Sequence, residues 1–196
     1  MNRNEIIETL KESGAFLEGH FLLTSGKHSN RYIEKIKLEQ YPNYVKILLA
    51  ELRKKVEEFD FDCVVSPALG AIVLGYELAR NMQKQFVFTQ RKNEIMTIRS
   101  GFDLNKGTKV LIVEDIVTTG GSVKEVIDCL EQREVQIMGI GVIVDRSNGK
   151  VKFDYPLKSL LNMEIDTYNP AECPMCKKGE ELFKPGASGK KLFNKK

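Results

Sequence analysis

The sequence lacks the features of a membrane or secreted protein. No apolar run approaches the roughly 20 residues that a membrane span requires, and residues 1–10 are polar and amphipathic, unlike a signal peptide. The four cysteines are too few and too dispersed for a disulfide framework, which fits a reducing compartment. We therefore expect a soluble, cytoplasmic protein.

The sequence also has no strong excess of one charge. Its net charge is +3, and the final 26 residues hold seven lysines against three glutamates, an excess of four, so the other 170 residues carry a net charge of −1. The mildly basic character therefore belongs to a C-terminal tail, and we expect neither a nucleic-acid partner nor a membrane partner.

Strand-like and helix-like segments alternate along the chain, and no internal repeat is visible. This order predicts an α/β domain built on a mostly parallel sheet that helices flank. We expect one domain over residues 1–170 and a loosely held basic tail over 171–196. The expected helices are 4–13, 42–59, 70–82 and one capped by Ser122, and the expected strands are 63–65, 86–88, 110–113, 135–144, 151–153 and 163–168, with a hairpin through 96–103.

The most specific motif is a polar loop that follows the apolar run 110–113. Ligands of parallel sheets bind at the carboxyl ends of the strands, where such loops lie. Glycines let an anion approach the backbone, amides and hydroxyls donate to it, and two adjacent acids suit the hydroxyls of a sugar or a cation. We therefore expect a phosphorylated sugar to bind here; the alternative is a polar turn with solvated acids. The loop consists of Glu114, Asp115, Ile116, Val117, Thr118, Thr119, Gly120, Gly121 and Ser122.

This loop closely resembles the ribose-phosphate loop of the type I phosphoribosyltransferases. The resemblance implies that Glu114 and Asp115 bind the 2′- and 3′-hydroxyls of phosphoribosyl pyrophosphate and that residues 118–122 bind its 5′-phosphate. Glu114 stands where many members carry aspartate. The loop has no Gly-Lys-Ser/Thr of a Walker A motif, and the Rossmann fingerprint has no preceding acid pair. The resemblance covers about residues 5–170 and implies the type I phosphoribosyltransferase fold with a small N-terminal hood region.

Two further segments resemble the pyrophosphate-binding parts of that family. The small-residue turn 66–71 resembles the loop whose backbone amides hold pyrophosphate, which implies that Ala68, Leu69 and Gly70 bind the donor; tight packing is the alternative. Segment 90–101 resembles a mobile basic loop that reaches into the neighbouring subunit's site. Arg91 and Lys92 match its opening residues, and a solvated hairpin face is the alternative.

The chain departs from the better-known enteric pattern at three positions. Ile95 and Thr97 replace a lysine and a histidine of the basic loop, and Thr24 replaces a lysine near the acceptor. Arg99 and Lys27 are the cations that would supply part of the missing charge. These differences bear on the rate and on the chemistry of the loop more than on the type of reaction.

Segments 21–32 and 142–146 resemble the signatures of the orotate phosphoribosyltransferases. Orotate is a planar pyrimidine with a carboxylate, which a guanidinium binds bidentately while an aromatic ring covers its face. The resemblance implies that Arg146, Tyr32, Lys27 and Thr118 bind orotate. The alternatives are an ion pair of Arg146 with a neighbouring acid, Asp145 or Glu114, and burial of Tyr32 in the core.

The implied reaction transfers ribose 5-phosphate from phosphoribosyl pyrophosphate to N1 of orotate, a step of pyrimidine biosynthesis. Orotate is already an anionic nucleophile, so the protein positions the reactants and stabilises charge. Asp115, Glu114 and Lys92 are the expected catalytic residues. Mg²⁺ is the implied cofactor and is held mainly by substrate oxygens and water, and the implied assembly is a homodimer with shared active sites.

The tail contains Cys173 and Cys176 in a Cys-x-x-Cys motif, which also resembles the end of one orotate phosphoribosyltransferase subgroup. Two soft ligands do not complete a structural zinc site, which needs four, so we predict no protein metal ligands and a plain tail with reactive thiols. A metal shared between subunits is the alternative. Cys63 and Cys129 are expected to be core residues.

The sequence leaves three competing functions open. The nearest is a purine or uracil phosphoribosyltransferase, against which Arg146 argues because a neutral purine offers no carboxylate. A regulator that senses the donor while binding nucleic acid would need a basic patch or an added module, and neither is visible. An inert interaction protein would not need the intact phosphate loop.

Overall fold

A six-stranded sheet forms the centre of the protein in a computed structural model, which describes residues 1–185. The strand order is β5-β4-β3-β6-β7-β8, and every neighbouring pair is parallel except β4 and β5. The predicted mostly parallel α/β sheet is thus confirmed. The strands are β3 (Cys63–Pro67), β4 (Gln85–Lys92), β5 (Ile95–Ile98), β6 (Lys109–Val117), β7 (Gln136–Asp145) and β8 (Leu157–Asn162).

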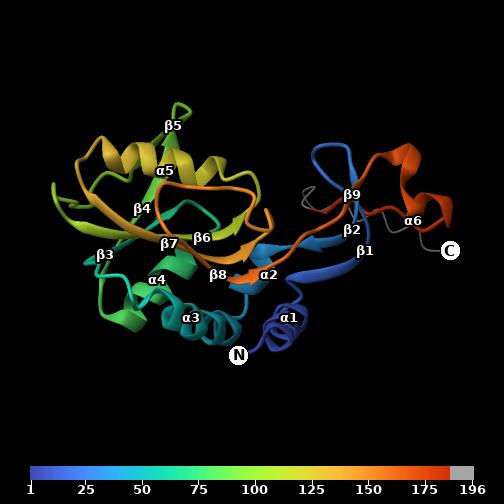
Figure 1. The fold of residues 1–196 in the computed structure, drawn as a ribbon, viewed down its shortest axis with the longest axis horizontal. Coiled ribbons are helices and arrows are strands. Elements are labelled where there is room, and N and C mark those ends of the chain that lie inside the picture. The colour runs from blue at the N-terminus through green and yellow to red at the C-terminus, as the bar shows by residue number, and fades with distance from the viewer. Residues whose placement is uncertain (186–196) are drawn as a thin grey trace.

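Helices cover both faces of this sheet (Figure 1). On β6, Leu111 and Val113 face one core, whereas Val110 and Ile112 face a second one. Successive side chains of a strand point to opposite faces, so a central strand between two helical layers is apolar throughout. Helices α3 (Pro42–Val56) and α4 (Ile72–Met82) cover the first face, and α5 (Gly121–Glu131) covers the second.

The predicted hood is a small antiparallel sheet beside the main domain (Figure 1). Its strands are β1 (Phe16–Leu22), β2 (His28–Ile33) and β9 (Thr167–Tyr168), in the order β1-β2-β9. Helix α1 (Arg3–Glu12) precedes it and begins with a capping box between Asn2 and Glu5. The short helix α2 (Lys35–Glu39) leads from the hood into the main domain.

The segment after residue 170 packs on the hood, which corrects the prediction of a loosely held extension. It forms η1 (Pro170–Glu172) and α6 (Pro174–Lys177), and Phe183 makes a parallel bridge with Phe21 of β1. Cys173 and Met175 are buried. The lysines at 190, 191, 195 and 196, part of the predicted basic tail, lie outside the described residues.

Several local predictions need correction. Strand β6 continues through Glu114 to Val117, residues 151–153 form no strand, and β8 was not predicted. Ser122 does not cap α5; the N-cap is Gly120, in the left-handed conformation. Among residues 1–185 no helix combines the length and the apolar character that a membrane span requires.

Candidate active site

The acid pair lies among the last residues of β6, at the carboxyl edge of the sheet. Glu114 and Asp115 are 6% and 4% exposed, so both carboxyl groups are buried. Oε1 of Glu114 accepts a hydrogen bond from the amide of Asp115 at 3.0 Å, and Oδ1 of Asp115 accepts one from the amide of Ile116 at 2.6 Å. The alternative of solvated acids is therefore wrong.

Asp115 has a cationic partner from outside the loop. Nζ of Lys35, on α2, lies 2.6 Å from Oδ2 of Asp115. Burial lowers the pKa of Lys35, but Asp115 and then Glu114 more than offset this, so the pKa is raised overall. Burial, followed by repulsion from Asp115, raises the pKa of Glu114 to about 8.

Lys35 and its neighbour Glu39 are site residues that the sequence analysis missed. Burial and the charge of Asp115 raise the pKa of Glu39 to about 7, although Lys35 opposes this shift. The only signal in the sequence is a run of alternating charged and apolar residues over 34–39, which is also typical of a surface helix.

The small-residue turn after β3 approaches the acid pair closely. A Cβ atom at Gly70 would overlap Oδ2 of Asp115 and would lie 2.7 Å from Nζ of Lys35. A larger residue at this position would therefore displace the ion pair beneath the turn. The turn that contains Ala68 and Leu69 therefore borders the acids at the same edge of the sheet, where a ligand spanning both loops would bind.

The Thr/Gly segment between β6 and α5 forms a pocket of about 160 Å³, lined by residues 116–123 together with Glu114. Gly120 has φ 78°, and a Cβ atom there would lie 2.7 Å from Val151 and 3.0 Å from Phe153. Residues 151–153 thus support the loop from behind instead of forming a strand. No side chain caps the N-terminus of α5. Its first backbone amides are therefore available to donate hydrogen bonds to an anion in the pocket.

Arg146 lies beside this loop, directly after β7. Its amide donates to the carbonyl of Val117 at 2.8 Å, which joins the ends of β7 and β6. Its side chain is half-buried, Nε is buried without a hydrogen-bond partner, and no ion pair holds the guanidinium among the described residues. Burial lowers its pKa. Asp145, an alternative partner, instead accepts bonds from the amides of Ser147 and Gly149.

Tyr32 approaches Arg146 from the hood. It lies near the end of β2 and is half-buried, not enclosed in the core. Burial raises the pKa of its hydroxyl, and the positive charge of Arg146 opposes that shift, so the two groups are close in space. Its ring packs against Phe21 with centroids 5.8 Å apart. An aromatic ring and a guanidinium therefore border one side of the acid pair and phosphate loop.

Lys27 is not brought to this site. It lies at the tip of the β1–β2 hairpin, five residues before Tyr32, or about 16 Å at the usual rise of a strand. Thr118, by contrast, lines the phosphate pocket and follows Val117, whose carbonyl accepts the hydrogen bond from the amide of Arg146. The assignment of Lys27 to the acceptor thus receives no support from this arrangement.

The basic segment forms a tight hairpin between β4 and β5. Asn93 and Glu94 have φ values of 51° and 65°, as a two-residue hairpin turn requires. Arg91 forms a bidentate ion pair with Glu125 of α5, at 2.7 and 3.0 Å, and Lys92 is exposed near the tip. Arg91 is thus engaged with α5 of its own chain.

Two groups of side chains have the chemistry of metal ligands. The carboxylates of Glu114 and Asp115 are hard oxygen donors of the type that Mg²⁺ prefers, whereas a cluster of histidines and cysteines in the hood offers softer ligands. Cys63 and Cys129 are buried in the core, as predicted.

Comparison with known proteins agrees with this geometry. Residues 37–175 match the model of the phosphoribosyl transferase domain family. The orotate phosphoribosyltransferase of Caldicellulosiruptor bescii is 45% identical over 190 residues, which is 97% of this chain and all of that protein. The orotate phosphoribosyltransferase of Thermotoga maritima is 45% identical over 186 residues, which is 95% of this chain and all of that protein.

Solved structures share the fold. The orotate phosphoribosyltransferase of Aeropyrum pernix superposes with a TM-score of 0.72 at 24% identity, covering 81% of this chain and 94% of that one. An adenine phosphoribosyltransferase of Saccharomyces cerevisiae gives a TM-score of 0.64 at 19% identity, covering 81% and 99%. With the family model and the near full-length relatives, these matches establish that the chain belongs to the type I phosphoribosyltransferase family.

Proposed function

We propose that the protein transfers the 5-phosphoribosyl group of phosphoribosyl pyrophosphate to N1 of orotate, forming orotidine 5′-monophosphate and pyrophosphate. Near full-length relatives at 45% identity are orotate phosphoribosyltransferases. The observation that carries the choice of acceptor is the half-buried guanidinium of Arg146, which has no carboxylate partner among the described residues and lies near Tyr32.

The fold alone does not select the base, because adenine phosphoribosyltransferases superpose on the chain as well. A half-buried, unpaired guanidinium is unfavourable unless an anion binds it. The carboxylate of orotate is such an anion and forms bidentate hydrogen bonds with Arg146, while the ring of Tyr32 covers the pyrimidine. A purine leaves the guanidinium unpaired, so an orotate site fits these residues better than a purine site.

The donor binds along the edge of the sheet in three contacts. The amides and hydroxyls of residues 118–122 hold the 5′-phosphate, Asp115 and Glu114 orient the ribose hydroxyls, and the turn of residues 68–70 holds the pyrophosphate through backbone amides. Cleavage of the bond between C1′ and oxygen develops positive charge on the ribose. The buried carboxylates stabilise this charge as they hold the reactants in position.

Mg²⁺ is the cofactor that fits this site. Glu114 and Asp115 supply hard oxygen atoms at the ribose position, and Mg²⁺ commonly binds one or two carboxylates together with substrate oxygens and water. When bound, the ion neutralises negative charge on the departing pyrophosphate. Lys35, which pairs with Asp115 in the metal-free protein, would compete with the ion for this carboxylate.

A homodimer with shared active sites completes the proposal. The hairpin with Arg91 and Lys92 resembles the family's mobile basic loop, and it contributes these two cations to a partner's site. Large apolar side chains support such an interface on the outer side of α4 and the turn before it: Leu69, Val73 and Tyr76 are 80%, 41% and 58% exposed. The free cysteines fit the reducing environment of the cytoplasm, which we propose as the compartment.

An enzyme assay tests this function directly. Protein, Mg²⁺ and phosphoribosyl pyrophosphate are mixed with orotate, and the loss of orotate absorbance in the ultraviolet is followed. Adenine, hypoxanthine and uracil serve as competing acceptors in parallel reactions. Among the four acceptors, we expect only orotate to be turned over. Turnover with a purine or uracil and none with orotate would refute the acceptor assignment.

A further inference from the structure

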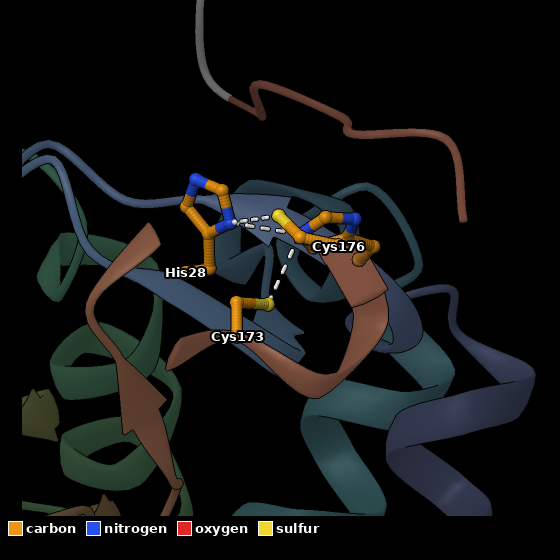
Figure 2. Close-up of side chains that lie close together, drawn as sticks. His28, Cys173 and Cys176 are labelled. Carbon is orange, nitrogen blue, oxygen red and sulfur yellow. Dashed lines mark hydrogen bonds between the residues drawn. The ribbon is translucent and has the colours of Figure 1, made fainter. Parts of the chain in front are cut away.

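A second cluster of reactive side chains lies in the hood, away from the acid pair and the phosphate loop. It consists of His20, His28, Cys173 and Cys176, whose ligand atoms all lie within 4.8 Å of one another. Figure 2 shows His28, Cys173 and Cys176 with their side chains converging on a common centre. None of these residues takes part in the proposed transfer reaction.

The fold assembles this cluster from the two ends of the chain. His20 lies on β1 and His28 begins β2, so the hairpin places the two rings together with centroids 4.8 Å apart. Cys173 is the N-cap of α6, and Cys176 lies within that helix. Helix α6 follows η1 and precedes the bridge of Phe183 to β1. Cys173 is fully buried, and His20 and His28 are only 3% and 5% exposed.

Hydrogen bonding alone does not satisfy these contacts. Nε2 of His20 lies 2.9 Å from Nδ1 of His28, 3.5 Å from Sγ of Cys173 and 3.6 Å from Sγ of Cys176. Nδ1 of His20 lies 2.9 Å from the carbonyl oxygen of Glu180, which only accepts, so Nδ1 carries the proton and Nε2 has a single lone pair. One lone pair cannot serve three neighbours, whereas a cation at the centre would contact all of them.

The distances are close to those of a closed tetrahedral site. Bond lengths of about 2.3 Å for zinc–sulfur and about 2.0 Å for zinc–nitrogen give separations of about 3.3 to 3.8 Å between ligands. Sγ of Cys176 lies 3.2 Å from Nδ1 of His28, and all separations within the cluster are at most 4.8 Å. Small shifts of the side chains therefore convert this arrangement into a Cys₂His₂ site, and no carboxylate belongs to the cluster.

The surroundings of the cluster also favour a bound metal. The hydrogen bond from His20 to the Glu180 carbonyl fixes the ring and leaves Nε2 as the ligand atom, as in many metal sites. Two thiolates balance the charge of a divalent ion, so the occupied site is neutral and suits burial. Binding releases the two thiol protons to solvent, and no oxidation is involved.

We propose that these four residues bind one structural Zn²⁺ ion within a single chain. Soft thiolates with imidazoles in tetrahedral geometry are the ligand set of zinc, and four protein ligands leave no position for catalysis. The ion fastens the C-terminal segment to the β1–β2 hairpin, and thereby stabilises the small sheet that carries Tyr32. This replaces the prediction of a plain tail, and it needs no ligand from a second subunit.

Metal analysis of the purified, chelator-free full chain tests the proposal. We expect about one zinc ion per chain, released when the thiols are modified with a mercurial reagent. The double variant Cys173→Ser/Cys176→Ser should retain less than about 0.1 zinc per chain. Cys129→Ser is the matched control, since Cys129 is a core cysteine, and it should keep the full zinc content.

Cobalt substitution of the metal-free wild-type protein provides a second, spectroscopic readout. Co²⁺ added to metal-free wild-type protein should give the visible absorption of a tetrahedral site and a thiolate charge-transfer band, and Cys176→Ala should weaken that band. The proposal is overturned if equimolar zinc leaves the thiol titration of the metal-free wild-type protein unchanged, or if the double variant retains the zinc of the wild type.

Discussion

Nζ of Lys35 lies 2.6 Å from Oδ2 of Asp115, and a Cβ atom at Gly70 in the turn above would collide with both atoms. The carboxylate proposed to hold the ribose is thus paired with a cation before any donor arrives. This pairing compensates for placing Asp115 next to another buried acid, Glu114. Lys35 therefore contributes to the stability of the ligand-free protein as well as to the charge balance of the site.

Replacing Lys35 with methionine should destabilise the ligand-free protein. The change leaves Asp115 buried without its cation, and because Lys35 is itself half-exposed we expect a loss of about 1–2 kcal/mol. Urea unfolding at pH 7 measures the difference. Lys92→Met, at an exposed position, is the control and should change stability by less than about 0.5 kcal/mol; equal effects of the two variants would contradict a structural role for the ion pair.

Arg146→Ala should weaken orotate binding by roughly 2–4 kcal/mol, the range for removing one partner of a buried charged pair. Binding of phosphoribosyl pyrophosphate should change little, because the donor contacts lie on other loops. Isothermal titration with each substrate measures both affinities. Arg146→Lys keeps the charge but loses the bidentate geometry, so its orotate affinity should lie between those of the wild type and Arg146→Ala. Unaltered orotate affinity in Arg146→Ala would remove this residue from the acceptor site.

Asp115→Asn should lower turnover by about 100-fold or more, the scale for losing one preorganised charge-stabilising group. The asparagine has nearly the same shape, so circular dichroism should show an intact fold. Steady-state kinetics with saturating substrates gives the turnover number. A variant as fast as the wild type would show that Asp115 does not contact the reacting ribose.

Gly120→Ala should destabilise the protein and weaken donor binding. The left-handed conformation costs alanine about 1–2 kcal/mol, and the new methyl group also meets Val151 and Phe153. Gly149→Ala is the matched control, because Gly149 has φ 73° but open space around it. Thermal unfolding and donor titration should show a larger effect at Gly120; equal effects would mean that the packing behind the loop is unimportant.

Stability of the ligand-free protein should fall as the pH rises from about 5 to about 8. The pKa values of Glu114 and Glu39 are raised to about 8 and about 7 in the folded state. The folded state thus binds more protons than the unfolded state in this window, and stability decreases as these acids lose them. Melting temperatures across the window measure the slope, which Glu114→Gln should flatten. A slope unchanged in that variant would show that Glu114 does not titrate there.

The parts of the fold that follow from local sequence were predicted well. The apolar stripe of α3 and the wholly apolar start of β6 have periodicities that leave little choice of structure. The phosphate loop was recognised because its residue types are specific. By contrast, the end of β6 was predicted too early. The strand continues through the acids because its pairing with β7 extends to Val117 regardless of side-chain polarity.

Features that depend on tertiary contacts could not be predicted. Lys35 is an ordinary lysine in the sequence and becomes a site residue only because α2 passes under Gly70. His20 and His28 likewise gain meaning only when the hairpin meets Cys173. The predicted strand at residues 151–153 instead packs against Gly120, a contact between segments thirty residues apart.

The hood has an order of assembly built into it. Its first two strands leave the ribosome early, but the third strand and the cysteine-bearing turn are made only after residue 166, when the whole parallel sheet has been synthesised. The hairpin with Tyr32 must therefore wait until residues 167–183 have been made before its partners exist. The strands and loops that carry the sugar-phosphate contacts all precede this segment, so the half of the site that receives the base is the last to gain its supporting sheet.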